Sequence, residues 1–474
     1  MTFSIQDVFA SAPLTVISLA AVIVLVVESL SDKTERLNCW LTIIGLLAAI
    51  AAALASLDSS GTAYNEMLAT GGYANYFSVV FCLAGLLTVM LSPSYIKKES
   101  IGHGEYYSMV LFAVAGMMLM AAAADLITFF LGLELMSISF YVMAGFARKR
   151  IISNEAALKY FLLGAFATGF LLYGIALLYG ATGTTNLAVI ATGIALFSTN
   201  ILFIVGLGLL MVGLVFKVAA VPFHMWVPDV YEGSPTTVSG FMSTGGKAAA
   251  FSAFLLIFSP ALVTVMGSVR EVLAVLAALS MVVGNIFAIA QSNIKRMLAY
   301  SSIAHAGYIL TGIVAANSLG SNGVLFYLMA YTAMNVGAFG VLSILESNDG
   351  GNLTFDDYTG LSTKRPALAA LMALFMFSLL GIPPFAGFFG KYYVFAGAIQ
   401  GGYTWLAIVG VLMSVVSAYY YLRLVVLMYF KEQVSVIEAV VPNLGLTALV
   451  ISAIVLFVFG IYPSAIISVT SHFF

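Results

Sequence analysis

The sequence predicts an all-α polytopic membrane protein with about fourteen transmembrane helices. Of its 474 residues, 62% are hydrophobic and only 8% are charged, whereas an ordinary soluble domain carries about 25% charged residues. The mean hydropathy is +1.08, and apolar runs long enough to cross a bilayer recur along the whole chain. These observations exclude a soluble enzyme and a disordered scaffold. The net charge of -2 also excludes a basic surface for nucleic acid.

Fourteen apolar segments are the predicted spans. The first contains Pro13 and Glu28, and no Lys or Arg precedes Lys33. It therefore lacks the basic start of a signal peptide, and we interpret it as a retained span. The predicted ranges are 11–30, 39–57, 73–92, 106–123, 125–146, 156–180, 200–225, 236–259, 270–291, 298–316, 322–345, 366–399, 404–430 and 443–465.

The distribution of positive charge supports this count. Loops on the cytoplasmic side of a membrane are enriched in Lys and Arg. With the N-terminus outside, the loops after the odd-numbered spans contain twelve of the 18 basic residues, and only Arg270 lies on the other side. The sequence therefore predicts that both termini face the periplasm. The twelve residues are Lys33, Arg36, Lys97, Lys98, Arg148, Lys149, Arg150, Lys295, Arg296, Lys364, Arg365 and Lys431.

Ionisable side chains inside the spans are the candidate functional residues. Each charged residue at the bilayer centre costs about 3 kcal/mol on insertion scales, so such residues usually have a function. Lys159 lies near the start of its span and could instead extend to the interface. The two histidines could be hydrogen-bonded core residues. The candidates are Glu134, Lys159, Lys217, His224, Lys247, His305 and Lys391.

One buried acid among several lysines suits proton transfer. A carboxylate that approaches or leaves a buried amine controls whether that amine keeps its proton. Protonated lysines are poor metal ligands, and Cys39 and Cys82 are too few for an iron–sulfur cluster or a disulfide framework. No nucleophile or nucleotide-binding motif is present.

Two predicted helix breaks support transport. Pro222 lies between Lys217 and His224 in span 7, and Gly381, Pro383 and Pro384 precede Lys391 in span 12. Broken helices at membrane depth line polar cavities and mark ion sites. Simple proline kinks are the alternative interpretation.

The spacing of the breaks predicts a repeat. The broken spans are five apart, so spans 4–8 and 9–13 can be two inverted five-helix repeats. The chain is predicted to form a single transmembrane domain. Its segments are 1–105 (spans 1–3), 106–260 (first repeat), 261–430 (second repeat) and 431–474 (span 14).

Four segments resemble the antiporter-like membrane subunits of complex I, the proton-translocating NADH–quinone oxidoreductase. They are LGLELMSISFY, PFHMWVPDVYEGSPTTVSGFMSTGGKAAAF, NIKRMLAYSSIAHAGY and GIPPFAGFFGKYYVF. Within that family the chain is most similar to the subunit N group. Lys247 stands where the sister subunits have a histidine-containing run, and Lys391 stands where subunit M usually has Glu.

The resemblance implies a role for each candidate in proton translocation. Glu134 and Lys217 would form the charge pair of the first half-channel, with Lys159 alongside. Lys247 and His224 would form the central relay. His305 would be a polar link, and Lys391 would exchange protons with the outside.

The resemblance also implies cofactors, partners and location. This subunit would hold no cofactor, and flavin, iron–sulfur clusters and quinone would belong to partner subunits. The partners would be subunit M and the small membrane subunits, in a prokaryotic cell (inner) membrane. Two alternatives stay open: a subunit of a multi-subunit Na+/H+ antiporter or membrane-bound hydrogenase, and a non-transporting assembly scaffold. Co-purifying subunits would discriminate among these.

Overall fold

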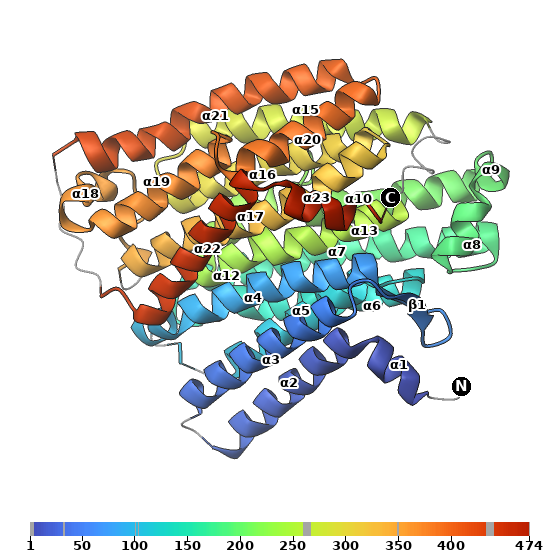
Figure 1. Cartoon of the computed structure of the whole chain (residues 1–474), viewed down its shortest axis with the longest axis horizontal. Coiled ribbons are helices and arrows are strands. Elements are labelled where there is room, and N and C mark those ends of the chain that lie inside the picture. Colours follow the sequence, from blue (N-terminus) through green and yellow to red (C-terminus); the bar gives the residue numbers. More distant parts are fainter. Residues whose placement is uncertain are drawn as a thin grey trace.

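The computed structural model describes residues 4–31, 34–99, 101–102, 104–258, 267–347, 350–432 and 440–473. Within these ranges the chain forms a bundle of long helices that lie side by side (Figure 1). Twelve of the described segments are long and apolar enough to cross a membrane. The shorter helix α5 and the broken pair α19–α20 complete the predicted fourteen. The prediction of an all-α polytopic fold is confirmed.

The helices of the first half follow the predicted spans, with shifts of a few residues at most of their ends. A short helix, α1 (Ile5–Ala10), precedes them. The others are α2 (Ala12–Leu30), α3 (Glu35–Ala55), α4 (Gly72–Lys98), α5 (Glu105–Ala121), α6 (Leu126–Ala144), α7 (Ile151–Thr182), α8 (Leu187–Thr192), α9 (Ile194–Phe197), α10 (Ile201–Val218), α11 (Trp226–Gly233), α12 (Thr236–Phe241), the π-helix η1 (Met242–Gly246) and α13 (Lys247–Ile257).

The second half repeats this pattern of long helices with one break. Its elements are α15 (Gly267–Ile289), α16 (Ile294–Val314), α17 (Ser318–Leu345), the 3-10 helix η3 (Asp356–Tyr358), α18 (Leu361–Lys364), α19 (Pro366–Leu380), α20 (Ala386–Gln400), α21 (Thr404–Phe430), α22 (Asn443–Ile461) and α23 (Ser464–Thr470).

Short polar side chains fix where several helices begin. The Asp125 carboxylate accepts the Ile127 N–H at 2.8 Å at the start of α6. Because the first N–H groups of a helix have no partner within it, such a cap stabilises the start by about 1 kcal/mol. Asparagine side chains cap α8, α10, α16 and α17 in the same way; they are Asn186, Asn200, Asn293 and Asn317.

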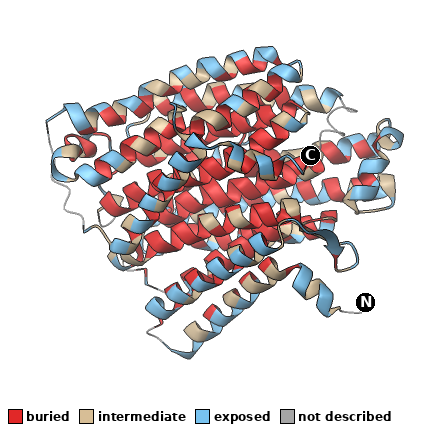
Figure 2. Ribbon diagram, in the orientation of Figure 1, coloured by how far each residue is buried: buried red, intermediate tan, exposed pale blue. Residues whose placement is uncertain are grey.

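The centre of the bundle is buried and its outer helices are not. Nearly every residue of α17 is buried, and α12, η1, α13 and α16 are similarly enclosed. Figure 2 shows this inner set in red and the outer helices in mixed colours. Large apolar side chains are exposed along α2, α7 and α21. Such surfaces suit a lipid environment better than water.

Two features at one end of the bundle were not predicted. Strands β1 (Ser60–Ala63) and β2 (Leu68–Gly71) form an antiparallel hairpin in register Ser60↔Gly71. The short helices α8 and α9 lie at the same end (Figure 1). We call this the hairpin end. Phe473 packs near Gly72 and Tyr73 of α4, so the described C-terminal residues lie there too.

The opposite end carries most of the basic residues, and we call it the basic end. The loop that contains η3 and α18 lies there (Figure 1). It contacts the start of α16, because the Ile294 N–H donates to the Leu353 carbonyl at 2.8 Å. Lys98, Arg150 and Lys295 meet next to this loop. Lys33, counted with them, lies outside the described residues.

Candidate functional site

The first helix break lies between α10 and α11. α10 ends at Val218, and Ala219 adopts a left-handed conformation with φ 64°. The Ala219 N–H donates to the Phe216 carbonyl at 3.1 Å, which satisfies one of the last carbonyls of the helix. Pro222 follows and has no N–H with which to continue it. The predicted break is confirmed, although the helix of span 7 ends well before residue 225.

The second break lies between α19 and α20. α19 ends at Leu380, and Gly381 has φ 91°, a conformation that glycine adopts without a steric penalty. Pro383 and Pro384 separate it from the start of α20. A methyl group on Gly381 would lie 3.1 Å from Cδ of Lys391. The break and this lysine are therefore in direct contact.

Lys217 lies beside the first break, where only 7% of the residue is exposed. Its ammonium donates to Ser137 Oγ at 2.8 Å and to Tyr141 OH at 3.3 Å. The Tyr141 and Tyr160 rings lie 5.4 and 5.8 Å from Nζ, within the range of cation–π attraction. Neutral groups thus surround the charge.

Glu134 is the carboxylate expected to pair with Lys217. It lies one turn before Ser137 on α6, and its Oε1 is buried with no hydrogen-bond partner among the described residues. Lys217 donates to Ser137 and Tyr141 instead. The acid acts on the amine electrostatically, while Ser137 makes the direct contact. The expected charge pair therefore acts through electrostatics, without a described hydrogen bond between Glu134 and Lys217.

Lys159 lies in a surface ion-pair network, and the ring of its neighbour Tyr160 lies 5.8 Å from the Lys217 ammonium. Its side chain is 41% exposed and pairs with Glu155 at 2.6 Å and with Asp229 at 3.0 Å. Asp229, on α11, also pairs with Arg296 of α16 at 2.8 Å. Carboxylates of α7 and α11 therefore hold this amine at the molecular surface.

Lys247 directly follows the π-helical turn η1, in the middle of span 8. A π turn accommodates one extra residue and often occurs at functional sites. Lys247 is 2% exposed, and its ammonium donates to both the carbonyl and the hydroxyl oxygen of Ser302 at 2.5 Å. Tyr231 and Tyr331 interact with the same hydroxyl. Ser302 thus connects Lys247 to α16.

His305 lies one turn beyond Ser302 on α16 and is 1% exposed. Its Nδ1 is 2.7 Å from Tyr327 OH, and its Nε2 is 3.1 Å from Tyr421 OH. Tyr421 OH is also 2.5 Å from Ser301 Oγ. Because both ring nitrogens face hydroxyl groups, the imidazole can accept a proton on one side and donate one on the other.

Polar side chains continue from His305 toward Lys391. The ring of Tyr421 lies 4.4 Å from that of Tyr420. Tyr420 OH donates to Asn285 Oδ1 at 2.9 Å, and Asn285 Nδ2 donates to Tyr308 OH at 3.0 Å. Nζ of Lys391 lies 4.9 Å from the centre of the Tyr308 ring.

Lys391 extends back to the second break. Its ammonium donates to the Leu380 carbonyl and to Ser414 Oγ, both at 2.7 Å. The Leu380 carbonyl is at the C-terminal end of α19, where the helix dipole favours a cation. Lys217 has the same setting at the end of α10. Both breaks thus place a lysine against a helix C-terminus.

His224 was grouped with Lys247, and no described hydrogen bond joins the two side chains. It is half-buried in the segment between α10 and α11, next to the exposed Met225. Its Nδ1 is buried without a hydrogen-bond partner among the described residues. The Lys247 ammonium donates to Ser302, whereas the His224 imidazole interacts with the backbone of Pro222.

Three serines hold the three buried ammonium groups, and sequence reasoning missed them. Ser137 contacts Lys217, Ser302 contacts Lys247 and Ser414 contacts Lys391. Two of them had a signal, since Ser137 follows Glu134 by three residues and Ser302 precedes His305 by three. No such signal pointed to Ser414, because no ionisable residue lies within a helical turn of it in the sequence.

The arrangement can transfer protons. Amines, an imidazole and hydroxyl groups follow one another through hydrogen bonds and ring contacts, and each of these polar groups can hold or release a proton. In the described part of the chain, no three His, Cys, Asp or Glu side chains are placed to hold a metal ion.

Comparisons with known proteins give the family. Residues 123–417, which include every candidate residue, match the family described as NADH:quinone oxidoreductase/Mrp antiporter, TM. NADH-quinone oxidoreductase subunit N of Trichlorobacter lovleyi is 48% identical over 98% of this chain and 96% of its own length. NADH-quinone oxidoreductase subunit N 1 of Chloroherpeton thalassium is 47% identical over 99% of this chain and 98% of its own.

A solved structure agrees. The fold matches a chain of respiratory complex I from Thermus thermophilus with a TM-score of 0.85 and 38% identity, covering 96% of this chain and 98% of that one. The resemblance found in the sequence is confirmed. The chain belongs to the family of antiporter-like membrane subunits of complex I, in the NADH-quinone oxidoreductase subunit N group.

Proposed function

We propose that this chain moves protons across the membrane through its buried polar row, as a membrane-arm subunit of a complex I-type quinone oxidoreductase. The observation that carries the proposal is the chain of contacts from Lys247 to Ser302, through Tyr331 to His305, and on through the tyrosines to Lys391. Family membership supports the coupling to quinone reduction, because the relatives are named as subunits of that enzyme.

Each candidate has a role in this path. Glu134 and Lys217 take up the proton, and Ser137 holds the Lys217 ammonium. Lys247 is the central carrier, His305 passes the proton between hydroxyl groups, and Lys391 releases it at the second break. Two like charges about 10 Å apart repel by about 1.7 kcal/mol at an effective dielectric constant of about 20. A proton that arrives on one lysine therefore promotes release from the next.

Lys159 and His224 act at the edges of the path. Lys159 lines a cavity of about 100 Å³ together with Glu155, Asp229 and Glu232. This charged cavity can collect protons near the uptake site. His224 follows the first break, and its unpartnered Nδ1 can exchange a proton there.

The breaks support two inverted repeats. We assign the first repeat to residues 106–260 and the second to 261–430, with 1–105 and 431–474 flanking them. Each repeat has its broken span in the fourth position, α10–α11 in the first and α19–α20 in the second.

The location and the partners follow from the family and the charge distribution. We place the basic end in the cytoplasm and both termini in the periplasm of a prokaryotic cell (inner) membrane. Flavin, iron–sulfur clusters and quinone belong to partner subunits, so electron transfer drives this chain through the membrane arm. Subunit M and the small membrane subunits are the expected neighbours.

The experiment is redox-driven proton pumping by membrane vesicles. We expect Glu134→Ala and Lys217→Ala to lose most of the pumping while the complex still assembles on native gels, because each removes part of the uptake site. Lys364→Ala removes an exposed lysine at the basic end and should pump normally. Full pumping by either uptake variant would refute the assignment.

A further inference from the structure

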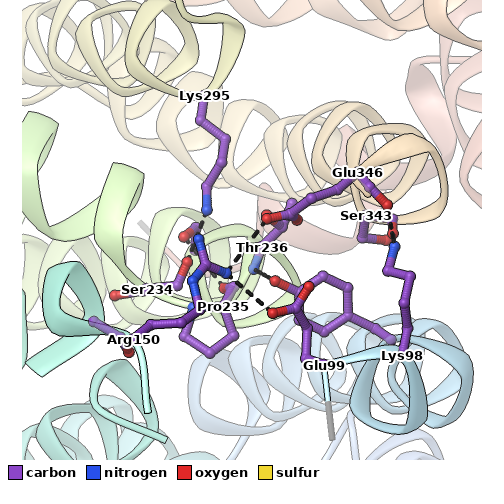
Figure 3. Close-up of polar contacts among 12 residues, drawn as sticks. Lys98, Glu99, Arg150, Ser234, Pro235, Thr236, Lys295, Ser343 and Glu346 are labelled. Atoms are coloured by element: carbon purple, nitrogen blue, oxygen red, sulfur yellow. Dashed lines mark hydrogen bonds and ion pairs between the residues drawn. The ribbon is translucent and has the colours of Figure 1, made fainter. Parts of the chain in front are cut away.

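A second set of buried charges, with members other than the lysines of the row, lies at the basic end and is drawn in Figure 3. We call it the buried charge cluster, and its members are Lys98, Glu99, Arg150, Lys295 and Glu346. They come from the ends of α4, α7, α16 and α17. The Glu99 and Glu346 side chains are 3% and 0% exposed, and Lys295 is 0% exposed. Burying an ion costs several kcal/mol unless it is well paired.

The two lysines of the cluster bind main-chain oxygens. Lys98 Nζ donates to the Ser343 carbonyl at 2.9 Å and to the Glu346 carbonyl, at the C-terminal end of α17. Lys295 Nζ donates to the Ser234 carbonyl at 2.7 Å, at the end of α11. Their charges stabilise helix ends. The remaining cation of the cluster, Arg150, therefore pairs with the two carboxylates.

Arg150 is shared between the two carboxylates. Its Nη1 lies 3.2 Å from Glu99 Oε2 and 3.6 Å from Glu346 Oε1. Glu346 Oε2 accepts a hydrogen bond from Thr236 Oγ1 at 2.5 Å. Glu99 Oε1 and Glu346 Oε1 are buried, and neither accepts a hydrogen bond from the described residues. One guanidinium therefore serves two acids, and each acid has one buried oxygen that accepts no described hydrogen bond.

Such a pair favours binding one proton. Burial and the neighbouring Glu346 carboxylate raise the pKa of Glu99, although Arg150 and Lys98 oppose the shift. A proton bound by Glu99 relieves the repulsion between the two carboxylates. The charged and titratable groups that face the pair are Lys98, Arg150, Lys295, Tyr95 and Tyr358.

Hydroxyl groups lead from the pair toward Lys247 along span 8. Thr236, Ser239, Ser243 and Lys247 are spaced three or four residues apart, so they lie on one face of the helix. From Thr236 to Lys247 the helix rises about 16 Å. Ser239 and Ser243 are both fully buried.

Asn335 of α17 connects this stripe to the Lys247 site. Its Nδ2 donates to Ser243 Oγ at 2.7 Å and to Tyr331 OH at 3.0 Å. Tyr331 also interacts with Ser302, which holds the Lys247 ammonium. Asn335 Oδ1 is buried without a described partner, so it can accept a further hydrogen bond.

We propose that Glu99 and Glu346 form a proton-loading pair that supplies Lys247 from the basic end. The proposal rests on the proton-translocating function and adds an uptake site distinct from Glu134. A proton from the aqueous phase binds one carboxylate, passes along the hydroxyl stripe and is taken up by the neutral amine of Lys247. The pair returns to two carboxylates around Arg150, and no electron or other reactant takes part.

The test measures protons moved per electron by the whole complex reconstituted in vesicles. Glu99→Gln and Glu346→Gln keep the side-chain size and remove the proton-binding site. Lys247→Ala is the benchmark, and Asp356→Asn removes an exposed carboxylate at the same end as a control. Each glutamine variant should lower the number of protons moved per electron as far as Lys247→Ala lowers it. Asp356→Asn should leave this number unchanged.

The outcomes separate the two proposals. A normal ratio in both glutamine variants, next to a reduced ratio in Lys247→Ala, overturns the loading pair and leaves the proposed function intact. A normal ratio in Lys247→Ala overturns the proposed function itself.

Two further measurements distinguish loading from a structural role, even if Glu346→Gln fails to assemble. At neutral pH the wild-type complex should show the infrared absorption of a protonated carboxyl group that Glu99→Gln removes. Wild-type pumping should also slow as the pH at the basic end rises through the pKa of Glu99, and Glu99→Gln should lose this dependence. Absence of the infrared signal, or a Glu99→Gln variant that keeps the wild-type pH dependence, overturns the proposal.

Discussion

At the scale of single residues, the buried ammonium groups of Lys217, Lys247 and Lys391 each donate to a serine hydroxyl. A carboxylate in contact would hold the proton on the lysine as an ion pair, and breaking such a buried pair is costly. A hydroxyl group can accept one hydrogen bond and donate another, so it stabilises the ammonium without trapping its proton. The serine contacts therefore suit a carrier that must load and unload.

Lys391 tests whether the proton itself matters. Arg is effectively never deprotonated in proteins, whereas a buried Lys can be. Lys391→Arg should therefore impair pumping although the positive charge remains. The measurement is the ratio of protons moved to electrons transferred in vesicles at matched assembly.

Lys391→Ala supplies the comparison. If the residue were only a structural cation, Arg would substitute with little loss while Ala failed. Full coupling in the Arg variant beside a defective Ala variant would reject the titrating role.

The lysines could be predicted from the sequence, but their contacts could not. An ionisable residue stands out in an apolar span because of its insertion cost. Whether Lys217 meets Glu134 or Ser137 depends on the rotation of α6 against α10, which no local pattern determines. Lys159 shows the same limit, because Asp229 is brought to it by the packing of α11 against α7.

At the scale of elements, each break brings a lysine to the end of a helix. Gly381 ends α19 with φ 91°, and its missing side chain leaves room for the Lys391 chain that reaches the Leu380 carbonyl. The shape of the break thus determines where the charge lies.

Gly381→Ala should lower pumping through this contact. An alanine in the left-handed conformation costs about 1–2 kcal/mol, and its methyl group would also press on Lys391 at 3.1 Å. Gly402→Ala is the matched control, since Gly402 has φ 85° and open space around its Cβ position. Pumping by assembled complexes should fall further in Gly381→Ala than in Gly402→Ala. Equal values would show that the contact with Lys391 does not matter.

The sequence predicted the long elements well and missed the small ones. Hydropathy indicates the length of each apolar segment, and proline and glycine indicate where a helix breaks. The spans and both breaks could therefore be predicted. The β1–β2 hairpin depends on pairing between two short segments that read as a loop. The π turn η1 differs from the surrounding α-helix only in its backbone hydrogen bonding, and the amino-acid composition does not indicate it.

At the scale of the whole molecule, the two ends of the bundle differ in charge. The hairpin end includes β1, β2, α8 and α9, whereas the basic end carries the buried charge cluster. The positive-inside rule places the basic end in the cytoplasm.

Single cysteines can test this orientation in intact cells. A cysteine replacing Thr184, at the hairpin end, should react with an impermeant thiol reagent, and one replacing Lys97, at the basic end, should not. The natural Cys39 and Cys82 are buried and should give little background. Labelling at position 97 but not at 184 would invert the orientation.

The row of proton carriers also has an electrical consequence. Lys247 and His305 lie midway along their spans, and Lys217 and the Lys391 ammonium lie at the breaks within theirs. The row therefore crosses the bundle at nearly one depth. A charge that crosses the whole membrane does work of about 2.3 kcal/mol per 100 mV, but a charge that moves within the membrane plane does almost none. Membrane voltage can thus oppose the uptake and the release of a proton. The direction in which a proton moves along the row depends instead on which carriers are already protonated.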